Sequence, residues 1–139
     1  MIPLDDLHPL LVHFPIALFG LVWLFDVLSV VLQDERFEFA SFWTLIMALL
    51  ATVGTIITGF IADQMEGHMD QFWLVFKTHG SMQLLSSINL ICLAVWRFRI
   101  HGKIPGNIAM KRIYFGLLTI AVLGIYYGSH LGAKLAGRI

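Results

Sequence analysis

Long runs without charged residues alternate with short polar segments along this chain of 139 residues. Residues 42–62 and 113–133 contain no Asp, Glu, Lys or Arg over 21 positions, and residues 9–25 and 80–96 contain none over 17. A transmembrane helix needs roughly 20 predominantly apolar residues. The pattern therefore predicts four transmembrane helices, near residues 9–32, 41–63, 72–97 and 112–134.

These segments do not alternate between apolar and polar positions, which argues against the strands of a membrane β-barrel. The direction of consecutive membrane-spanning helices alternates along the chain. The sequence thus predicts an all-α, integral membrane four-helix bundle with up-down-up-down topology. The length fits a single domain over residues 1–139.

The composition agrees with a membrane protein. The chain is 58% hydrophobic and 13% charged, whereas ordinary soluble domains are about 45–50% apolar and about 25% charged. Nine basic residues balance nine acidic ones, which argues against nucleic-acid binding through bulk positive charge. Cys92 is the single cysteine, so no disulfide can form within one chain.

The distribution of basic residues predicts the orientation of the bundle. The 33–40 and 98–111 connections with their flanks carry six basic residues, and the opposite side carries three. The six are Arg36, Arg97, Arg99, Lys103, Lys111 and Arg112, and the three are Lys77, Lys134 and Arg138. By the positive-inside rule, both termini are expected on the periplasmic side of a bacterial inner membrane.

Five of the six histidines fall at one end of the predicted bundle. Because helix direction alternates, the first and third helices begin at the end where the second and fourth finish. That end carries His8, His13, His68, His79 and His130, together with Asp63, while His101 lies at the other end. A lone histidine is usually a satisfied core residue, but three at similar depth on three helices favour a shared site.

The residues around these histidines suggest which helix faces meet at the site. His79, Gln83 and Ser86 fall within about 60° of one another around the third helix and form a polar stripe. On the first helix His13 shares a face with Gly20, and on the fourth Tyr127 shares one with His130. Small residues on these faces allow a close approach by another helix or by a flat ligand.

Two further features concern helix packing. Gly124, Gly128 and Gly132 form a series that predicts a tight helix–helix contact, either within the bundle or between protomers of a homo-oligomer. Asp26 lies near the inner end of the first helix, where we expect it to reach the interface or to pair with Arg97 or Arg112.

The histidine layer is compatible with b-type haem, which needs two axial imidazoles from opposite helices. The first and third helices of such a bundle are diagonal, so His13 and His79 are the expected axial pair. His8 and His130 come next as ligands, and Gln83, Ser86 and Tyr127 are candidates for hydrogen bonds to ligands or propionates. The expected partners are a quinone or a periplasmic redox protein.

Three alternatives remain open at this point. Imidazoles with Asp63 would suit a Cu or Zn ion, with His8, Met65, His68 and Met69 as further donors toward the outside. His and Asp would also serve proton or quinone handling. Finally, the chain would be a cofactor-free structural membrane subunit if its histidines only hydrogen-bond between helices.

A resemblance to a known family rests first on the stretch LHPLLVHFPIAL at residues 7–18. It resembles the H-P-x-x-V-H-F-P-I signature that opens a bacterial four-helix membrane family, domain of unknown function 2231. Thr58-Gly59-x-x-Ala62-Asp63 is similar to the end of that family's second helix, and Thr78-His79 to the start of its third. Gly128-Ser129-His130-Leu131-Gly132 is similar to its G-G-x-L-V ending, from which Ser129 and Gly132 depart.

The resemblance touches all four predicted helices. Some members resemble fusions to Rieske iron–sulfur or c-type cytochrome modules, which implies a setting of membrane electron transfer. This association raises haem above a metal ion as the expected cofactor, although a shared fold does not by itself assign a function.

Overall fold

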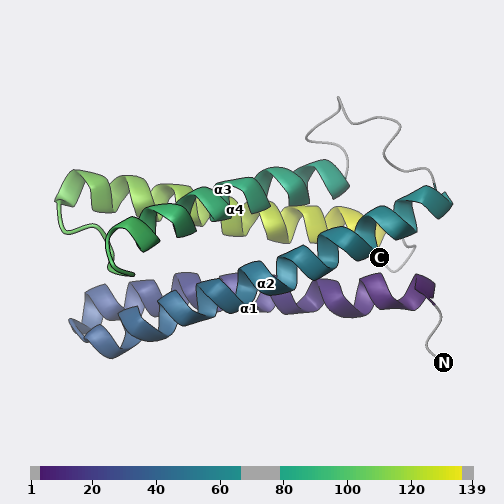
Figure 1. Ribbon diagram of the computed structural model, residues 1–139. Coiled ribbons are helices and arrows are strands. Elements are labelled where there is room, and N and C mark those ends of the chain that lie inside the picture. Colours follow the sequence, from purple (N-terminus) through teal and green to yellow (C-terminus); the bar gives the residue numbers. More distant parts are fainter. Residues whose placement is uncertain (1–3, 67–78, 136–139) are drawn as a thin grey trace.

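The computed structural model describes residues 4–66 and 79–135. For residues 4–9, 60, 62–66 and 135 it describes the backbone alone. Within these ranges the chain forms four helices: α1 (Leu4–Leu32), α2 (Glu35–Glu66), α3 (His79–Arg99) and α4 (Ile108–Leu135) (Figure 1). Each contains a stretch long and apolar enough to cross a membrane: Leu10–Leu32, Glu35–Gly59, His79–Arg99 and Ile108–Lys134. The predicted all-α membrane bundle is therefore confirmed.

The helices extend beyond the charge-free stretches that predicted them. α2 begins at Glu35 rather than at residue 41, and α4 begins at Ile108 rather than at residue 112. Glu35 and Glu38 lie in the first turn of α2, where carboxylates favour the positive end of the helix dipole. The helices thus begin before the charge-free stretches, and α2 does so with two acidic residues in its first turn. The expected beginning of the third helix, residues 72–78, lies outside the described residues.

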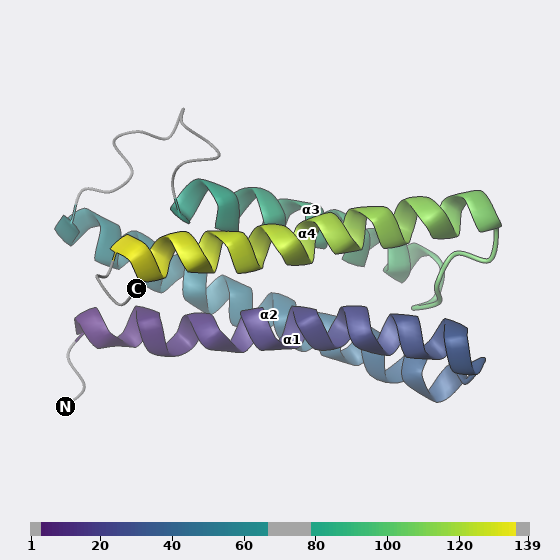
Figure 2. The same cartoon turned by 180° about the vertical axis from the view of Figure 1, so that it is seen from behind.

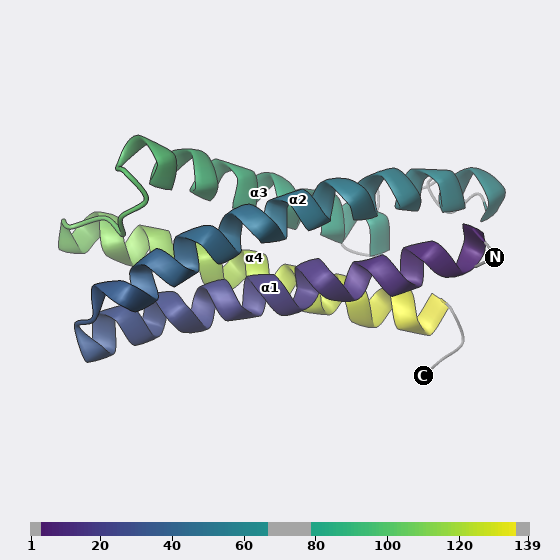
Figure 3. The same ribbon diagram turned by 60° about the horizontal axis from the view of Figure 1, so that its bottom comes forward.

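Two helical hairpins stack to make the bundle. α1 packs most extensively on α2 and α3 on α4, with smaller contacts between α1 and α4 and between α2 and α3. Figure 2 shows α4 running alongside α1 in the opposite direction, and Figure 3 shows α2 crossing between α1 and α3. α1 and α3 are therefore diagonal, as the predicted topology requires.

Apolar side chains occur both inside and outside this bundle. Phe19, Leu45, Leu90, Leu93 and Leu118 are buried in the core. Equally apolar residues are exposed on the outer faces: Leu50, Val53, Ile57, Ile88, Ile120 and Leu123. An apolar exterior along helices of spanning length contacts the lipid bilayer, whose hydrocarbon is as apolar as these side chains.

The turn between α1 and α2 is held by one acidic residue. The Asp34 carboxylate accepts hydrogen bonds from the backbone N–H of Arg36 at 2.9 Å and from its guanidinium at 2.7 Å. These hydrogen bonds, which come mainly from the Arg36 side chain, hold the pKa of the Asp34 carboxyl below its usual range. The start of α2 therefore keeps a charged capping carboxylate at neutral pH.

The start of α4 has a comparable cap. The side-chain oxygen Oδ1 of Asn107 accepts hydrogen bonds from the backbone N–H groups of Ala109 at 2.9 Å and Met110 at 3.3 Å. We expect Asn107→Ala to lower the free energy of unfolding by about 1 kcal/mol, because two helical N–H groups lose their acceptor. Asn107→Asp keeps the acceptor and serves as the control. Equal unfolding midpoints in detergent for the two variants would contradict this role.

Candidate functional site

The described histidines of the predicted layer lie at one end of the bundle. His13 is in the early part of α1, His79 begins α3 and His130 lies near the end of α4. Figures 1 and 2 show these three helix ends on the same side of the molecule. His101 lies in the α3–α4 connection at the opposite end, with a positive φ of 58°.

His79 is the histidine whose contacts are best defined. Its Nδ1 lies 2.6 Å from the backbone carbonyl oxygen of Gly128 in α4. A carbonyl oxygen only accepts, so Nδ1 carries the proton and donates it. In the neutral ring, Nε2 is then the nitrogen with the basic lone pair. A metal-ligating histidine is typically oriented in this way, with its second nitrogen donating to a carbonyl.

The rest of the polar stripe on α3 also faces α4. The Gln83 side-chain amide donates to Ser129 Oγ at 3.0 Å and to the carbonyl oxygen of Ile125 at 3.3 Å. Ser86 is buried and lies against Gly124. The predicted stripe therefore exists, and its side chains join α3 to α4.

The glycine series on α4 completes this contact. A Cβ added at Gly128 would lie 3.2 Å from Met82 Cβ, and one added at Gly132 would lie 2.8 Å from Nδ1 of His79. Gly124, Gly128 and Gly132 were expected to form a helix contact either within the bundle or between protomers, and the structure contains the contact within the bundle. The series packs against α3 of the same chain.

His13 lies on the exposed face of α1. The buried face of α1 carries Pro15, Phe19, Val22 and Asp26, whereas His13 is exposed. His13 and Pro15 are two residues apart, about 200° around an ideal helix. The described structure thus does not bring His13 and His79 against each other.

His8, the other histidine of α1, precedes His13 by five residues. α1 is one continuous helix through Pro9 and Pro15. His8 precedes Pro15 by seven residues, or about two helical turns. The side chain of His8 lies outside the described part.

The remaining predicted residues are dispersed. Tyr127 is 49% exposed and His130 is also exposed on the outer face of α4. No group of three or more His, Cys, Asp or Glu side chains able to hold a metal ion occurs among the described residues. The side chains of Asp63 and Met65, and all of His68 and Met69, lie outside the description, so the Cu or Zn alternative rests on the sequence.

The opposite end of the bundle contains a buried ion pair. Asp26 of α1 and Arg97 of α3 are both 0% exposed, and Arg97 Nη1 lies 3.0 Å from Asp26 Oδ1. The Tyr114 hydroxyl of α4 donates to Asp26 Oδ2 at 2.6 Å. The predicted pairing of Asp26 with a basic residue is confirmed, and its partner is Arg97 rather than Arg112.

Arg97 also reaches α2 and the α3–α4 connection. It donates to Ser41 Oγ at 2.9 Å, to the carbonyl oxygen of Glu38 at 3.2 Å and to that of Gly102 at 2.7 Å. Gly102 has a φ of +77°, and a Cβ there would lie 3.1 Å from the Phe42 ring. One guanidinium therefore links all four helices. Sequence reasoning missed Ser41, Tyr114 and Gly102 as its partners.

Comparison with known protein families identifies the chain. Residues 4–139 match the family of predicted membrane proteins designated DUF2231. The chain belongs to the DUF2231 family. The match covers all four helices of the DUF2231 bundle and agrees with the resemblance in the α1 motif. No curated protein and no solved structure matches this DUF2231 protein.

Proposed function

We propose that this DUF2231 protein is a membrane-bound b-type haem protein for electron transfer in the bacterial inner membrane. Its histidine end would face the periplasm, as the basic-residue distribution favours. The observation that carries the proposal is the 2.6 Å contact between His79 Nδ1 and the Gly128 carbonyl. It supports a half-buried imidazole held in the tautomer that an iron ligand requires.

His79 of α3 would supply one imidazole to hold the haem iron. A second imidazole would come from α1, the helix diagonal to α3. His13 is the residue first expected there, although its side chain is exposed, and His8 is the next candidate on α1. His130 is the remaining candidate. When bound, haem supplies a one-electron redox centre, and the chain would hold it and limit its access to water.

A quinone or a periplasmic redox protein would exchange electrons with such a site. His130 and Tyr127 lie exposed on the same end of α4. This position favours them as contacts at the rim rather than as ligands in the interior. A homo-oligomer would need a surface other than the glycine series, because that series contacts α3.

A cofactor-free structural subunit is the second candidate. One observation favours it: in the described part of the chain, every buried side-chain nitrogen and oxygen has a hydrogen-bond partner. Gln83 and Ser129 bond to each other rather than pointing toward a ligand. If the chain is a structural subunit, the polar side chains at the histidine end serve only to keep the helices aligned with one another.

Reduced-minus-oxidised visible spectra of the detergent-purified protein, from haem-supplied cells, test the proposal. We expect Soret and α bands at near-stoichiometric haem in the unmodified chain. His79→Gln removes the imidazole but keeps an N–H donor for Gly128, so it should fold and lose the bands. His8→Ala and His13→Ala identify the second ligand, because only the variant that removes it loses the bis-histidine spectrum.

The matched control is His101→Asn, which removes a histidine at the opposite end. Asn tolerates the positive φ found there, and this variant should keep the spectrum. A colourless but folded protein, with haem absent before and after reconstitution, would contradict the proposal. Bound Cu or Zn in that sample would support the metal alternative, and a sample empty of both would support the structural one.

A further inference from the structure

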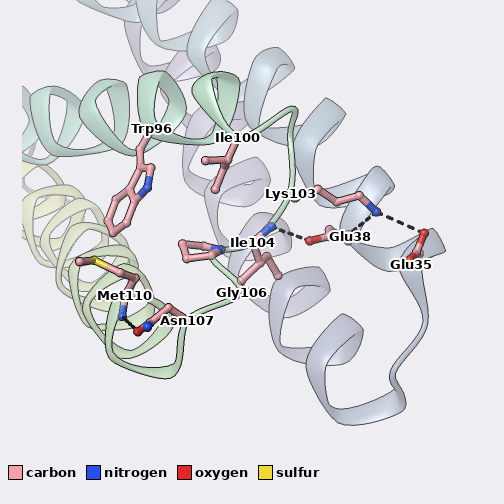
Figure 4. A pocket seen from close by; sticks show the side chains of 10 residues that line it. Glu35, Glu38, Trp96, Ile100, Lys103, Ile104, Gly106, Asn107 and Met110 are labelled. Carbon is pink, nitrogen blue, oxygen red and sulfur yellow. Dashed lines mark hydrogen bonds and ion pairs between the residues drawn. The ribbon is translucent and has the colours of Figure 1, made fainter.

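A cavity of about 610 Å³ opens at the end of the bundle opposite the histidines. It lies where α2 begins, α3 ends and α4 begins (Figure 4). Trp96, Ile100, Ile104 and Met110 give it an apolar wall, and Glu35, Glu38 and Lys103 line its polar side. The cavity is thus apolar on one side and charged on the other.

The charged side carries one carboxylate more than it has cations. Lys103 Nζ lies 3.2 Å from Glu35 Oε2 and 3.2 Å from Glu38 Oε2. The hydrogen bond from Lys103 to Glu35, and the weaker effect of the one to Glu38, raise the pKa of the Lys103 ammonium. The ammonium is therefore charged at neutral pH. The Glu38 side chain is 15% exposed and also accepts from the backbone N–H of Ile104, whereas Glu35 is 85% exposed.

The position of the cavity points to its occupant. Lys103 lies between the spans that end at Arg99 and begin at Ile108, at the level where lipid headgroups meet water. Trp96 belongs to the span itself and packs edge-on against Tyr114, with ring centroids 6.1 Å apart. A molecule with a charged head at Lys103 and a chain along Trp96 would be a lipid.

We propose that this cavity binds the headgroup of a zwitterionic aminophospholipid of the phosphatidylethanolamine type. Its primary ammonium would meet the exposed Glu35 carboxylate, its phosphate would meet Lys103, and an acyl chain would follow Trp96 and Met110. A phosphatidylglycerol head carries a negative charge and no cation, so it would leave the surplus carboxylate of the cavity without a partner. A phosphatidylcholine head has no N–H to donate to Glu35.

Native mass spectrometry tests this with the full chain in micelles containing equal amounts of the three lipids with identical acyl chains. We expect phosphatidylethanolamine to be retained about two- to fivefold more than either competitor, the ratio that exposed ion pairs sustain. Glu35→Gln removes the exposed carboxylate and should bring the ratio to phosphatidylcholine close to one. Lys103→Gln should weaken retention of all three.

Asp34→Asn is the matched control. Asp34 is the neighbouring acid, it does not line this cavity, and asparagine keeps a capping oxygen for Arg36. This variant should keep the preference for phosphatidylethanolamine. Equal retention of the three lipids by the unmodified chain, or a preference that persists in Glu35→Gln, would overturn the proposal. The experiment does not depend on haem.

Discussion

Replacing Arg97 by Met should lower the free energy of unfolding by about 3–5 kcal/mol, because it leaves a buried carboxylate without its cation. Asp26 is 0% exposed, so its carboxylate depends on protein groups for its stabilisation. The substitution also removes the donors to Ser41 and to the Gly102 carbonyl. We therefore expect all four helices to loosen at this end, as measured by thermal or denaturant unfolding in detergent.

Two further variants separate the ion pair from the size of the side chain. Arg99→Met removes an exposed arginine two residues later in α3 and should change stability by less than about 0.5 kcal/mol. Asp26→Asn combined with Arg97→Met removes both charges and should recover part of the loss. If the double variant were less stable than Arg97→Met alone, the unpaired carboxylate would not be the source of the loss.

Gly128→Leu should lower the free energy of unfolding by about 1–3 kcal/mol through overpacking at the histidine end. Gly128 is buried, and its added Cβ would already lie 3.2 Å from Met82 Cβ and 3.3 Å from the Gln83 amide nitrogen. Three more carbons would force α3 and α4 apart. The hydrogen bond from His79 to the Gly128 carbonyl would then break.

Gly116→Leu is the matched control on the same helix. Gly116 is exposed, and nothing lies within 4 Å of its added Cβ. Leucine is the better helix former, so this variant should gain about 0.5–1 kcal/mol. Opposite signs for the two glycines in the same unfolding assay support the contact. A loss of similar size at both positions would instead indicate a general intolerance of α4.

The four helices were predictable because the thickness of the membrane hydrocarbon sets the length of a spanning helix, and charge-free stretches of about that length are visible in the sequence. The placement of the three helix ends with His13, His79 and His130 followed from the alternation of direction alone. The pairing of Asp26 was also predictable, since a buried charge in a membrane needs a counter-charge. The choice of Arg97 rather than Arg112 as the partner depends on how far α1, α3 and α4 are shifted along their axes relative to one another. The spacing of residues within a single helix does not give this shift.

The interior face of α1 was not predictable. In a soluble bundle apolar residues mark the side that faces the core, but the lipid side of a membrane helix is equally apolar. The face containing His13 and Gly20 was expected to look inward. The structure leaves His13 exposed and places Gly20 half-buried against Tyr126 of α4, while Phe19 and Val22 are the fully buried residues of α1. The stripe on α3 was predictable because Gln83 and Ser86 are polar and require partners inside the bundle.

The separation of Asp26 and Arg97 along the chain, 71 positions, has a consequence for biogenesis. α1 leaves the ribosome well before α3 exists, so the newly made hairpin of α1 and α2 carries an acid with no counter-ion. We expect the Asp26 carboxylate to become fully buried only once Arg97 of α3 and the Tyr114 hydroxyl of α4 have packed against it. The buried ion pair thus couples the first helix to the last two, and we expect a fragment that stops after α2 to be less stable in the membrane than the full bundle.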